Sequence, residues 1–365
     1  MKKIIHLIAA ARPNFMKIAP LFHALKKESQ IDARIIHTGQ HYDVNMSDGF
    51  FKDLELPDPY LHLDIGSGTH AEQTGLVMMA YEKALFREKP DLVIVVGDVN
   101  STMAATLAAV KLERTVAHLE AGLRSFDRTM PEEINRIVTD VLSNILWTPS
   151  ADANDNLLAE GIPESKIQLV GNIMIDSLEM LRYRIEGDDS INRYGYPAGE
   201  YGVVTLHRPS NVDSRDILEI LCKALVQISK KSPILFPVHP RTRKNLISNG
   251  LLSVLESTPR LRLLEPLSYI PFMNLVFNCR FVVTDSGGLQ EETTYLSIPC
   301  ITVRSNTERP ITVTQGTNRL CQPYDLSAEV EDVLENKHQS STAPDLWDGK
   351  TAERVVQSVR EFLNL

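Results

Sequence analysis

Short apolar segments alternate with longer amphipathic segments along the chain, and the pattern occurs twice within 365 residues. The apolar segments are rich in isoleucine, valine and leucine with little polar alternation, which is typical of parallel strands buried on both faces. The first set of predicted strands comprises residues 4–10, 33–38, 92–97, 115–119, 145–148 and 168–170, and the second comprises 202–206, 234–238, 261–264, 281–284 and 300–303. The segments between them, such as 17–28, 71–89 and 217–231, have helical periodicity. The alternation predicts an α/β fold with two Rossmann-like domains, each built on a parallel sheet.

The chain is longer than one hydrophobic core usually organises, so two domains are expected. The pattern is weakest between residues 172 and 200, where glycine, proline and aspartate accumulate. We therefore predict an N-terminal domain over 1–171 and a C-terminal domain over 172–350. Residues 351–365 form an amphipathic helix in this interpretation, and we expect it to pack back on the N-terminal domain.

Charge and cysteine usage exclude several function classes. The formal net charge of −9 argues against a general nucleic-acid binder and against binding to anionic membranes, and no segment is long and apolar enough to span a bilayer. The four cysteines lack zinc-binding spacing, so we expect buried thiols, no metal site and a cytoplasmic protein. An anionic ligand would need a local basic or amide-lined pocket.

Polar residues close five of the predicted strands. These residues are Asp98, Glu120, His207, His239 and Asp285. Each alone is explained as well by helix capping or a turn. Open α/β sheets bind ligands at the carboxyl ends of their strands, so five such residues in both halves favour a functional site.

The segment 284–292, Thr-Asp-Ser-Gly-Gly-Leu-Gln-Glu-Glu, is the sharpest local signal. Glycines after a buried strand allow a phosphate to approach the backbone, and the next helix contributes free amides. Arg304 and Arg309 follow the next strand and can add positive charge. The alternative is a glycine-rich turn with an acidic first helical turn. The glycine motifs typical of NAD and ATP sites are absent.

Two further groups each allow two interpretations. Arg12 and Lys17 flank the start of the first helix, where they either bind an anion or are solvated. Glu120 ends a strand, and Glu132 and Glu133 follow Pro131 at a predicted helix start. Glu120 and Glu132 can serve as an acid–base pair, or Glu132 and Glu133 can simply favour the helix N-terminus.

Together these segments resemble the non-hydrolysing UDP-N-acetylglucosamine 2-epimerases. The matching segments, in family order, are 12–20, 38–41, 97–102, 118–125, 131–136, 205–208, 285–292 and 307–310. The resemblance implies the two-domain fold of GT-B glycosyltransferases, with the active site in the interdomain cleft. It also implies a homodimer that supplies activated sugar for surface polysaccharide synthesis.

The reaction implied by the resemblance interconverts UDP-N-acetylglucosamine and UDP-N-acetylmannosamine. UDP leaves by anti elimination to give 2-acetamidoglucal and then adds back, and no cofactor or metal is needed. Three rivals remain: a hydrolysing epimerase that releases N-acetylmannosamine and UDP, a GT-B glycosyltransferase, and a non-catalytic UDP-sugar sensor. The substrate can also be a modified UDP-hexosamine. Residues 42–46 differ from the stretch used for allosteric activation in many bacterial members, so we do not expect activation in that form.

The resemblance assigns roles by matching position. The implied catalytic residues are Asp98, Glu120, Glu132 and His207. The implied substrate-binding residues are Arg12, Lys17, His239, Phe272, Ser286, Gly287, Gly288, Glu292 and Arg309. Among these, Arg12, Arg309 and residues 286–288 would hold the diphosphate, Glu292 the ribose and Phe272 the uracil. Which carboxylate removes the C2 proton stays open.

Overall fold

The computed structural model describes the whole chain except residues 1, 40–50, 52 and 336–341. The described residues form two compact units, one comprising Met1–Met180 with Asp345–Leu365 and the other Leu181–Pro344. The division lies within helix α7 (Ile173–Glu186), after Met180, whereas the boundary expected from the sequence follows residue 171. No helix among the described residues is long and apolar enough to cross a membrane.

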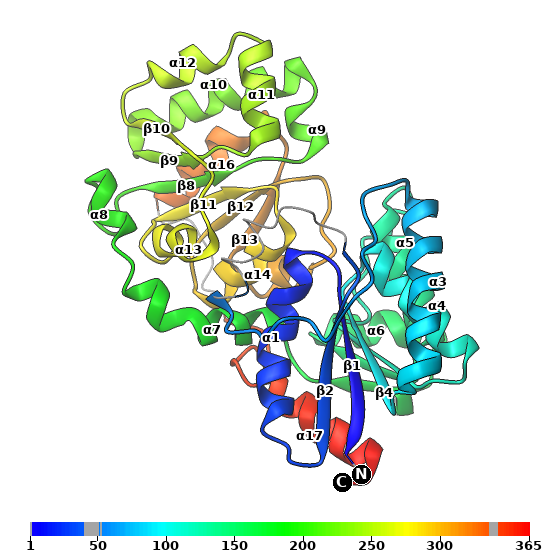
Figure 1. The fold of residues 1–365 in the computed structure, drawn as a ribbon. Coiled ribbons are helices and arrows are strands. Elements are labelled where there is room, and N and C mark those ends of the chain that lie inside the picture. The colour runs from blue at the N-terminus through cyan, green and yellow to red at the C-terminus, as the bar shows by residue number, and fades with distance from the viewer. Residues whose placement is uncertain (1, 40–50, 52, 336–341) are drawn as a thin grey trace. The chain divides into compact units, whose positions relative to one another are not determined.

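The first unit is a seven-stranded parallel sheet in the order β3-β2-β1-β4-β5-β6-β7. Figure 1 shows this sheet between α1 and α17 on one side and α3, α4 and α5 on the other. Its strands are β1 (Lys3–Ala9), β2 (Ile31–His37), β3 (Leu61–His62), β4 (Leu92–Val96), β5 (Val116–Leu119), β6 (Ile145–Thr148) and β7 (Ile167–Leu169). Its helices, besides the start of α7, are α1 (Arg12–Lys26), α3 (His70–Glu88), α4 (Asn100–Lys111), α5 (Pro131–Leu142), α6 (Ala151–Ala159), the 3-10 turn η1 (Glu164–Lys166) and α17 (Thr351–Leu363).

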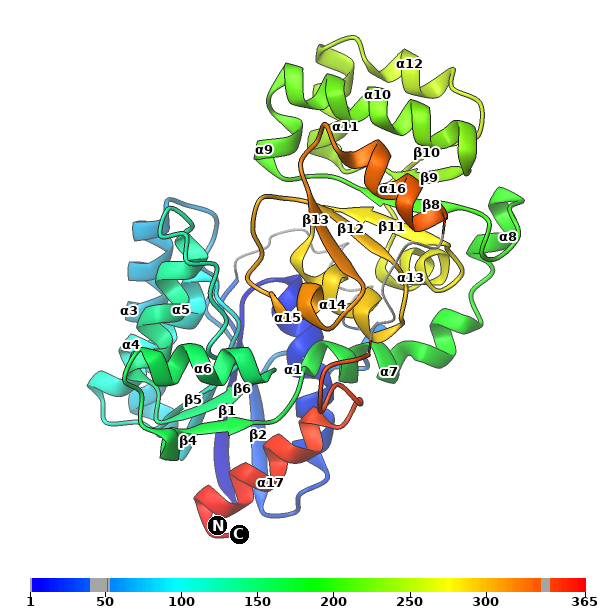
Figure 2. The ribbon, with the colours of Figure 1, turned by 180° about the vertical axis from the view of Figure 1, so that it is seen from behind.

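The second unit is a six-stranded parallel sheet in the order β10-β9-β8-β11-β12-β13, seen best in Figure 2. Its strands are β8 (Gly202–Thr205), β9 (Ile234–Pro237), β10 (Leu261–Leu264), β11 (Phe281–Thr284), β12 (Cys300–Val303) and β13 (Asn318–Cys321). Its helices are α8 (Ser190–Tyr194), α9 (Pro209–Val212), α10 (Arg215–Lys231), α11 (Pro240–Ser248), α12 (Leu252–Glu256), α13 (Tyr269–Phe277), α14 (Gly287–Tyr295), α15 (Ile311–Thr314) and α16 (Leu326–Leu334).

The predicted parallel α/β fold is confirmed. Every predicted strand is present within two residues of its expected bounds, because these segments are buried on both faces, as in β4, whose five residues are all buried. The prediction missed β3, which has two residues, and β13, which carries Asn318 and Arg319.

The C-terminal helix α17 belongs to the first unit. Its Val355 and Val359 are fully buried, and it lies beside α1. The buried carboxylate of Asp176 accepts hydrogen bonds from the amides of Thr351 (3.0 Å) and Ala352 (2.7 Å). Because these amides belong to the first turn of α17, Asp176 satisfies donors that the helix itself leaves unpaired.

Candidate active site

Asp98 and Glu120 lie at the carboxyl ends of the neighbouring strands β4 and β5. The strands pair Val96 with Leu119, which puts the residues that follow them at the same edge of the sheet. Glu120 is 6% exposed and has a φ of 76°, which is uncommon for a residue with a side chain. The structure therefore brings these two predicted catalytic residues to one edge.

The buried Lys17 of α1 forms an ion pair with Glu120. A Cβ at Gly97 would lie 2.9 Å from the Lys17 Nζ, so the absence of a side chain there leaves room for the pair. The adjoining turn is held by Asn14, whose side-chain Nδ2 donates to the Val96 carbonyl (3.1 Å). Lys17 thus contacts a predicted catalytic carboxylate.

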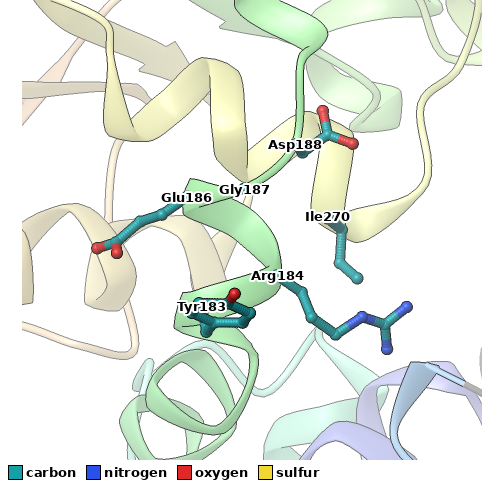
Figure 3. A pocket seen from close by; sticks show the side chains of 6 residues that line it. All are labelled: Tyr183, Arg184, Glu186, Gly187, Asp188 and Ile270. Atoms are coloured by element: carbon teal, nitrogen blue, oxygen red, sulfur yellow. The ribbon is translucent and has the colours of Figure 1, made fainter.

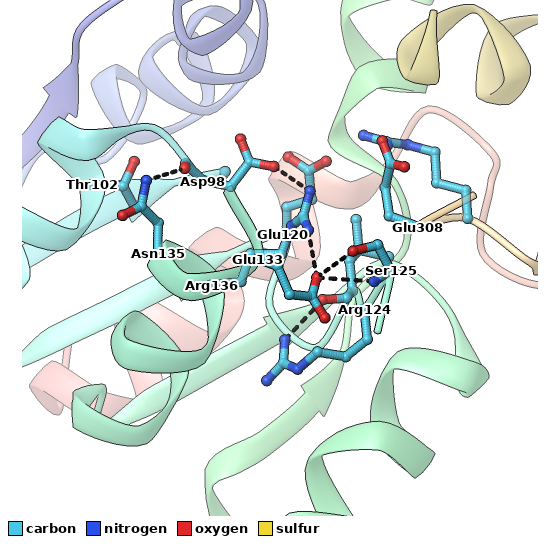
Figure 4. A network of polar contacts seen from close by, with 12 residues as sticks. Asp98, Thr102, Glu120, Arg124, Ser125, Glu133, Asn135, Arg136 and Glu308 are labelled. Atoms are coloured by element: carbon cyan, nitrogen blue, oxygen red, sulfur yellow. Dashed lines mark hydrogen bonds and ion pairs between the residues drawn. The ribbon is translucent and has the colours of Figure 1, made fainter. Parts of the chain in front are cut away.

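Helix α5 turns a polar face toward Asp98 (Figure 4). Arg136 lies between two carboxylates, with Nη2 2.5 Å from Asp98 Oδ2 and Nη1 2.9 Å from Glu133 Oε2. Glu133 also accepts hydrogen bonds from the amides of Ser125 and Phe126, both at 2.9 Å. Arg136 therefore fixes Asp98, and Glu133 fixes both Arg136 and the loop after β5.

Of the two glutamates at the start of α5, Glu133 is the buried one, at 1% exposure, whereas Glu132 is half-buried. The structure thus places Glu132 in the first turn of α5. Sequence reasoning treated Glu133 only as a helix-terminus charge and assigned no role to Arg136. The spacing of polar residues 133, 136 and 140 on one helical face is the signal that could have identified them.

A buried polar chain connects the two strand ends. His118 Nε2 lies 2.8 Å from the Gly97 carbonyl, so this nitrogen donates, and Nδ1 lies 2.6 Å from Asp140 Oδ1. Arg124 lies 2.7 Å from the other Asp140 oxygen and also from Glu160. Burial raises the pKa of Asp140, but His118 and Arg124 outweigh burial and the pKa is lowered. Through His118, these contacts hold the backbone at Gly97, directly before Asp98.

In the second unit, Asp285 orients His207. Its Oδ1 lies 2.9 Å from His207 Nδ1, and it accepts hydrogen bonds from the amide of Arg208 (2.9 Å) and the side chain of Asn211 (3.1 Å). Burial raises the pKa of Asp285, but His207 and the hydrogen bonds from Arg208 and Asn211 together outweigh burial and lower it. The ring of His239 lies 5.6 Å from that of His207, and burial together with His207 lowers the pKa of His239.

The glycine-rich turn after β11 leads directly into α14. Ser286 donates its amide to Thr284 Oγ1 (2.9 Å), and α14 begins at Gly287. A Cβ at Gly287 would lie 2.7 Å from both Arg309 Nη1 and Glu308 Oε1. Arg309 therefore packs against the N-terminus of α14, where free amides and the helix dipole attract anions.

The remaining predicted residues of this unit lie on α13 and α14. Glu292 is 5% exposed and accepts a hydrogen bond from the Tyr269 hydroxyl (2.6 Å). Phe272 lies one turn after Tyr269 on α13 and is half-buried. The Tyr269 contact thus joins the two helices that carry these residues.

Part of the prediction lies outside the described residues. The side chain of Arg12 is not among those described, and neither are residues 40–46 of the Gly-Gln-His segment and the stretch after it. Among the described residues, no group of three or more His, Cys, Asp or Glu side chains is arranged to hold a metal ion.

A separate pocket of about 660 Å³ lies in the second unit (Figure 3). It is lined by Tyr183, Arg184, Glu186, Gly187, Asp188 and Ile270. None of these is a predicted site residue.

Comparison with known proteins identifies the family. Residues 23–360 match the family model described as UDP-N-acetylglucosamine 2-epimerase. The chain is 42% identical over 357 residues to the UDP-N-acetylglucosamine 2-epimerase of Methanocaldococcus jannaschii, covering 96% of this chain and 97% of that protein. It is 40% identical over 318 residues to the UDP-2,3-diacetamido-2,3-dideoxy-D-glucuronate 2-epimerase of Pseudomonas aeruginosa, covering 86% of each.

Solved structures agree. The M. jannaschii UDP-GlcNAc 2-epimerase in complex with UDP-GlcNAc and UDP matches with a TM-score of 0.88 at 42% identity, over 98% of this chain and 99% of that one. A lipopolysaccharide outer core galactosyltransferase matches with a TM-score of 0.56 at 14% identity over 98% and 99% of the two chains, which shows a shared GT-B-like fold alone. The chain belongs to the UDP-N-acetylglucosamine 2-epimerase family, as its motifs indicated.

Proposed function

We propose that this chain catalyses the reversible, non-hydrolytic epimerisation of UDP-N-acetylglucosamine at C2 to give UDP-N-acetylmannosamine. The observation that carries the proposal is the pair Asp98 and Glu120 at adjacent strand ends, each held by its own cation, Arg136 and Lys17. Two carboxylates in different surroundings can divide proton removal and proton return between them. The family match supports the same chemistry.

The proposed first step removes the C2 proton to a carboxylate. The electrons of the C2–H bond form the C1=C2 double bond, and the C1–O bond breaks so that its electron pair leaves with UDP. The reverse step on the other face of the glucal protonates C2 and returns UDP to C1. Asp98, Glu120 and Glu132 are the proposed acid–base residues, and either paired carboxylate can be the C2 base.

The second unit is proposed to hold UDP throughout, because an escaped intermediate would end the reaction. Arg309 and residues 286–288 would bind the diphosphate, with Arg12 added from the first unit and Lys17 and His239 near the sugar. Glu292 would bind the ribose and Phe272 the uracil. Since Asp285 contacts Nδ1 of His207, the opposite ring nitrogen is proposed to stabilise the departing diphosphate.

The test is proton NMR of the protein with UDP-N-acetylglucosamine in D2O. The expected result is a new UDP-mannosamine-type anomeric signal and deuterium at C2, both lost in Asp98→Asn and Glu120→Gln. An Asp91→Asn protein, changed at an ion pair with Lys3, is the matched control and should keep full turnover. Free N-acetylmannosamine with UDP would instead indicate the hydrolysing reaction. Acceptor-dependent loss of sugar would indicate a glycosyltransferase, and tight binding without turnover a sensor.

A second candidate substrate is a UDP-2,3-diacetamido-2,3-dideoxyuronate. The P. aeruginosa relative named for that sugar is nearly as similar, at 40% identity, as the UDP-N-acetylglucosamine relatives at 42% and 41%. The two nucleotide sugars should be compared by kcat/KM in the same assay. A ratio of at least about tenfold in favour of UDP-N-acetylglucosamine, equivalent to 1.4 kcal/mol of transition-state binding, is expected.

We further propose a cytoplasmic homodimer that feeds surface polysaccharide synthesis, as the family resemblance implies. Sedimentation velocity at micromolar concentration tests the dimer, and a monomer there would contradict it.

A further inference from the structure

Arg304 follows β12 by one residue and is 8% exposed. Its Nη2 donates to Glu308 Oε2 (2.8 Å). Its Nη1 is buried, and among the described residues it finds no hydrogen-bond acceptor. An unpaired buried donor on a charged group is costly, and a common explanation is an acceptor supplied by a ligand.

The position of Arg304 points to the kind of ligand. Strands β11 and β12 pair Thr284 with Thr302, so the turn before α14 and the residues after β12 leave the same edge of the sheet. Glu308, the partner of Arg304, lies so close to the start of α14 that a Cβ at Gly287 would be 2.7 Å from its Oε1. Arg304 is therefore linked through one carboxylate to a helix N-terminus suited to anions.

Glu308 is a buried carboxylate shared among arginines. It lies 2.6 Å from Arg309, 2.8 Å from Arg304 and 3.9 Å from Arg208. Burial raises the pKa of Glu308, but Arg309 and Arg304 outweigh burial and lower it strongly. Glu291 adds a second carboxylate 2.9 Å from Arg309 Nε. Three guanidinium groups thus lie among the carboxylates of Glu308, Glu291 and Asp285, and Glu308 contacts all three arginines.

We propose that Arg304 is a further diphosphate-binding residue and that Glu308 positions Arg304 and Arg309 for this task. The inference rests on the proposed function and deepens it. When the C1–O bond breaks, its electron pair leaves with the β-phosphate, so UDP gains one negative charge while the C2 proton moves to a carboxylate. The guanidinium of Arg304 stabilises that change, because Glu308 holds its Nη2 edge while Nη1 is left for a phosphate oxygen.

The test measures UDP affinity by isothermal titration calorimetry and uridine affinity by ligand-observed NMR. Arg304→Gln should weaken UDP binding about 10- to 100-fold, the loss expected for one charge-assisted hydrogen bond, without changing uridine binding. During turnover, 31P NMR should show more free UDP than in wild type. The matched control is Arg319→Gln. Arg319 lies on β13 of the same sheet and pairs with Glu329 of α16, and this variant should bind UDP as wild type does.

Glu308→Gln separates positioning from simple electrostatics. Removing a negative charge from the site should strengthen anion binding if Coulomb attraction alone mattered. The positioning role requires the opposite result, a UDP affinity at least about tenfold weaker, because Arg304 loses its carboxylate partner and Arg309 loses Glu308 but keeps Glu291. A Glu308→Gln protein with equal or tighter UDP binding overturns the role of Glu308.

The role of Arg304 is overturned if Arg304→Gln binds UDP as wild type does. If that protein does not fold, Arg304→Lys is measured instead, and weaker UDP binding at unchanged uridine binding is still required because an ammonium lacks the two-edged geometry. Wild-type protein that binds no UDP would overturn the proposed function and this role together, whereas normal wild-type binding with unchanged variants overturns this role alone.

Discussion

Replacing Asp140 with asparagine removes the carboxylate that contacts two buried side chains of the first unit, His118 and Arg124. Asp140 is fully buried and contacts His118 at 2.6 Å and Arg124 at 2.7 Å, and it accepts the amide of Gly122 at 3.1 Å. Asparagine keeps the size of the side chain but offers one acceptor and a competing donor. The change therefore removes the carboxylate from the buried His118 and from one edge of Arg124, whose other edge stays paired with Glu160, while packing stays the same.

Breaking a buried ion pair on one side costs about 3–5 kcal/mol of unfolding free energy. For a unit of this size, each kcal/mol lowers the unfolding midpoint by roughly 2–4 °C, so Asp140→Asn should lower it by about 6–20 °C. The matched control is Asp32→Asn, whose carboxylate is 41% exposed and pairs with Arg34. That change should cost about 0–1 kcal/mol. The loss of unfolding free energy in each variant is measured by urea and thermal denaturation, followed by circular dichroism at pH 7.

The pH dependence provides a second check. Because the pKa of Asp140 is lowered in the folded protein, its stabilisation is fully present above the unfolded-state pKa of about 4 and is lost as the pH falls through the folded-state value. The difference between wild type and Asp140→Asn should therefore be constant near neutral pH and shrink in acid. An Asp140→Asn protein within about 1 kcal/mol of wild type at pH 7, or a difference that grows in acid, would refute the reasoning.

Two glycine substitutions test local geometry. Gly122→Ala should cost about 2–5 kcal/mol of unfolding free energy, because φ is 81° and the new Cβ would lie 2.4 Å from the Ala153 carbonyl oxygen. Gly161 has a φ of 84° but open space around it, so Gly161→Ala measures the cost of the backbone conformation alone and should cost only about 1 kcal/mol. If urea denaturation gives the two variants the same loss of unfolding free energy, the clash at Gly122 is disproved. Gly287→Ala should weaken UDP binding about tenfold in calorimetry by displacing Arg309, and unchanged affinity would show that Arg309 does not depend on this close approach.

The sheets were predictable because their strands are apolar on both faces. Strand β4 is a continuous apolar run and was found, whereas β13 begins with the polar pair Asn318-Arg319 and was missed. Asn318 is nevertheless buried, and it accepts a hydrogen bond from Thr302 (2.6 Å) and donates to Gln290 (3.0 Å). Hydropathy patterns cannot identify a strand whose buried residues are polar and paired through side chains.

The strand-end residues were predictable from a general rule. Asp98, Glu120 and His207 follow within two residues of the ends of strands, and parallel sheets place such residues at the carboxyl edge of each sheet. The partners that fix these side chains come from segments distant in sequence. Arg136 reaches Asp98 across 38 positions, and Asp285 reaches His207 across 78. A single sequence shows the ends of strands but not which distant side chain will meet them.

Helix α5 shows why its functional face was harder to find. A helix normally buries its apolar stripe. In α5, Glu133, Arg136 and Asp140 are buried, whereas Ile134 and Val141 are about half exposed, at 48% and 53%. Burying charges is unfavourable unless each is paired, and here each of the three has an ion-pair partner. Helix α5 therefore buries charged residues in place of an apolar stripe, and its buried polar face holds Asp98 and the turn before it. This face belongs to the proposed catalytic apparatus and not to the hydrophobic core.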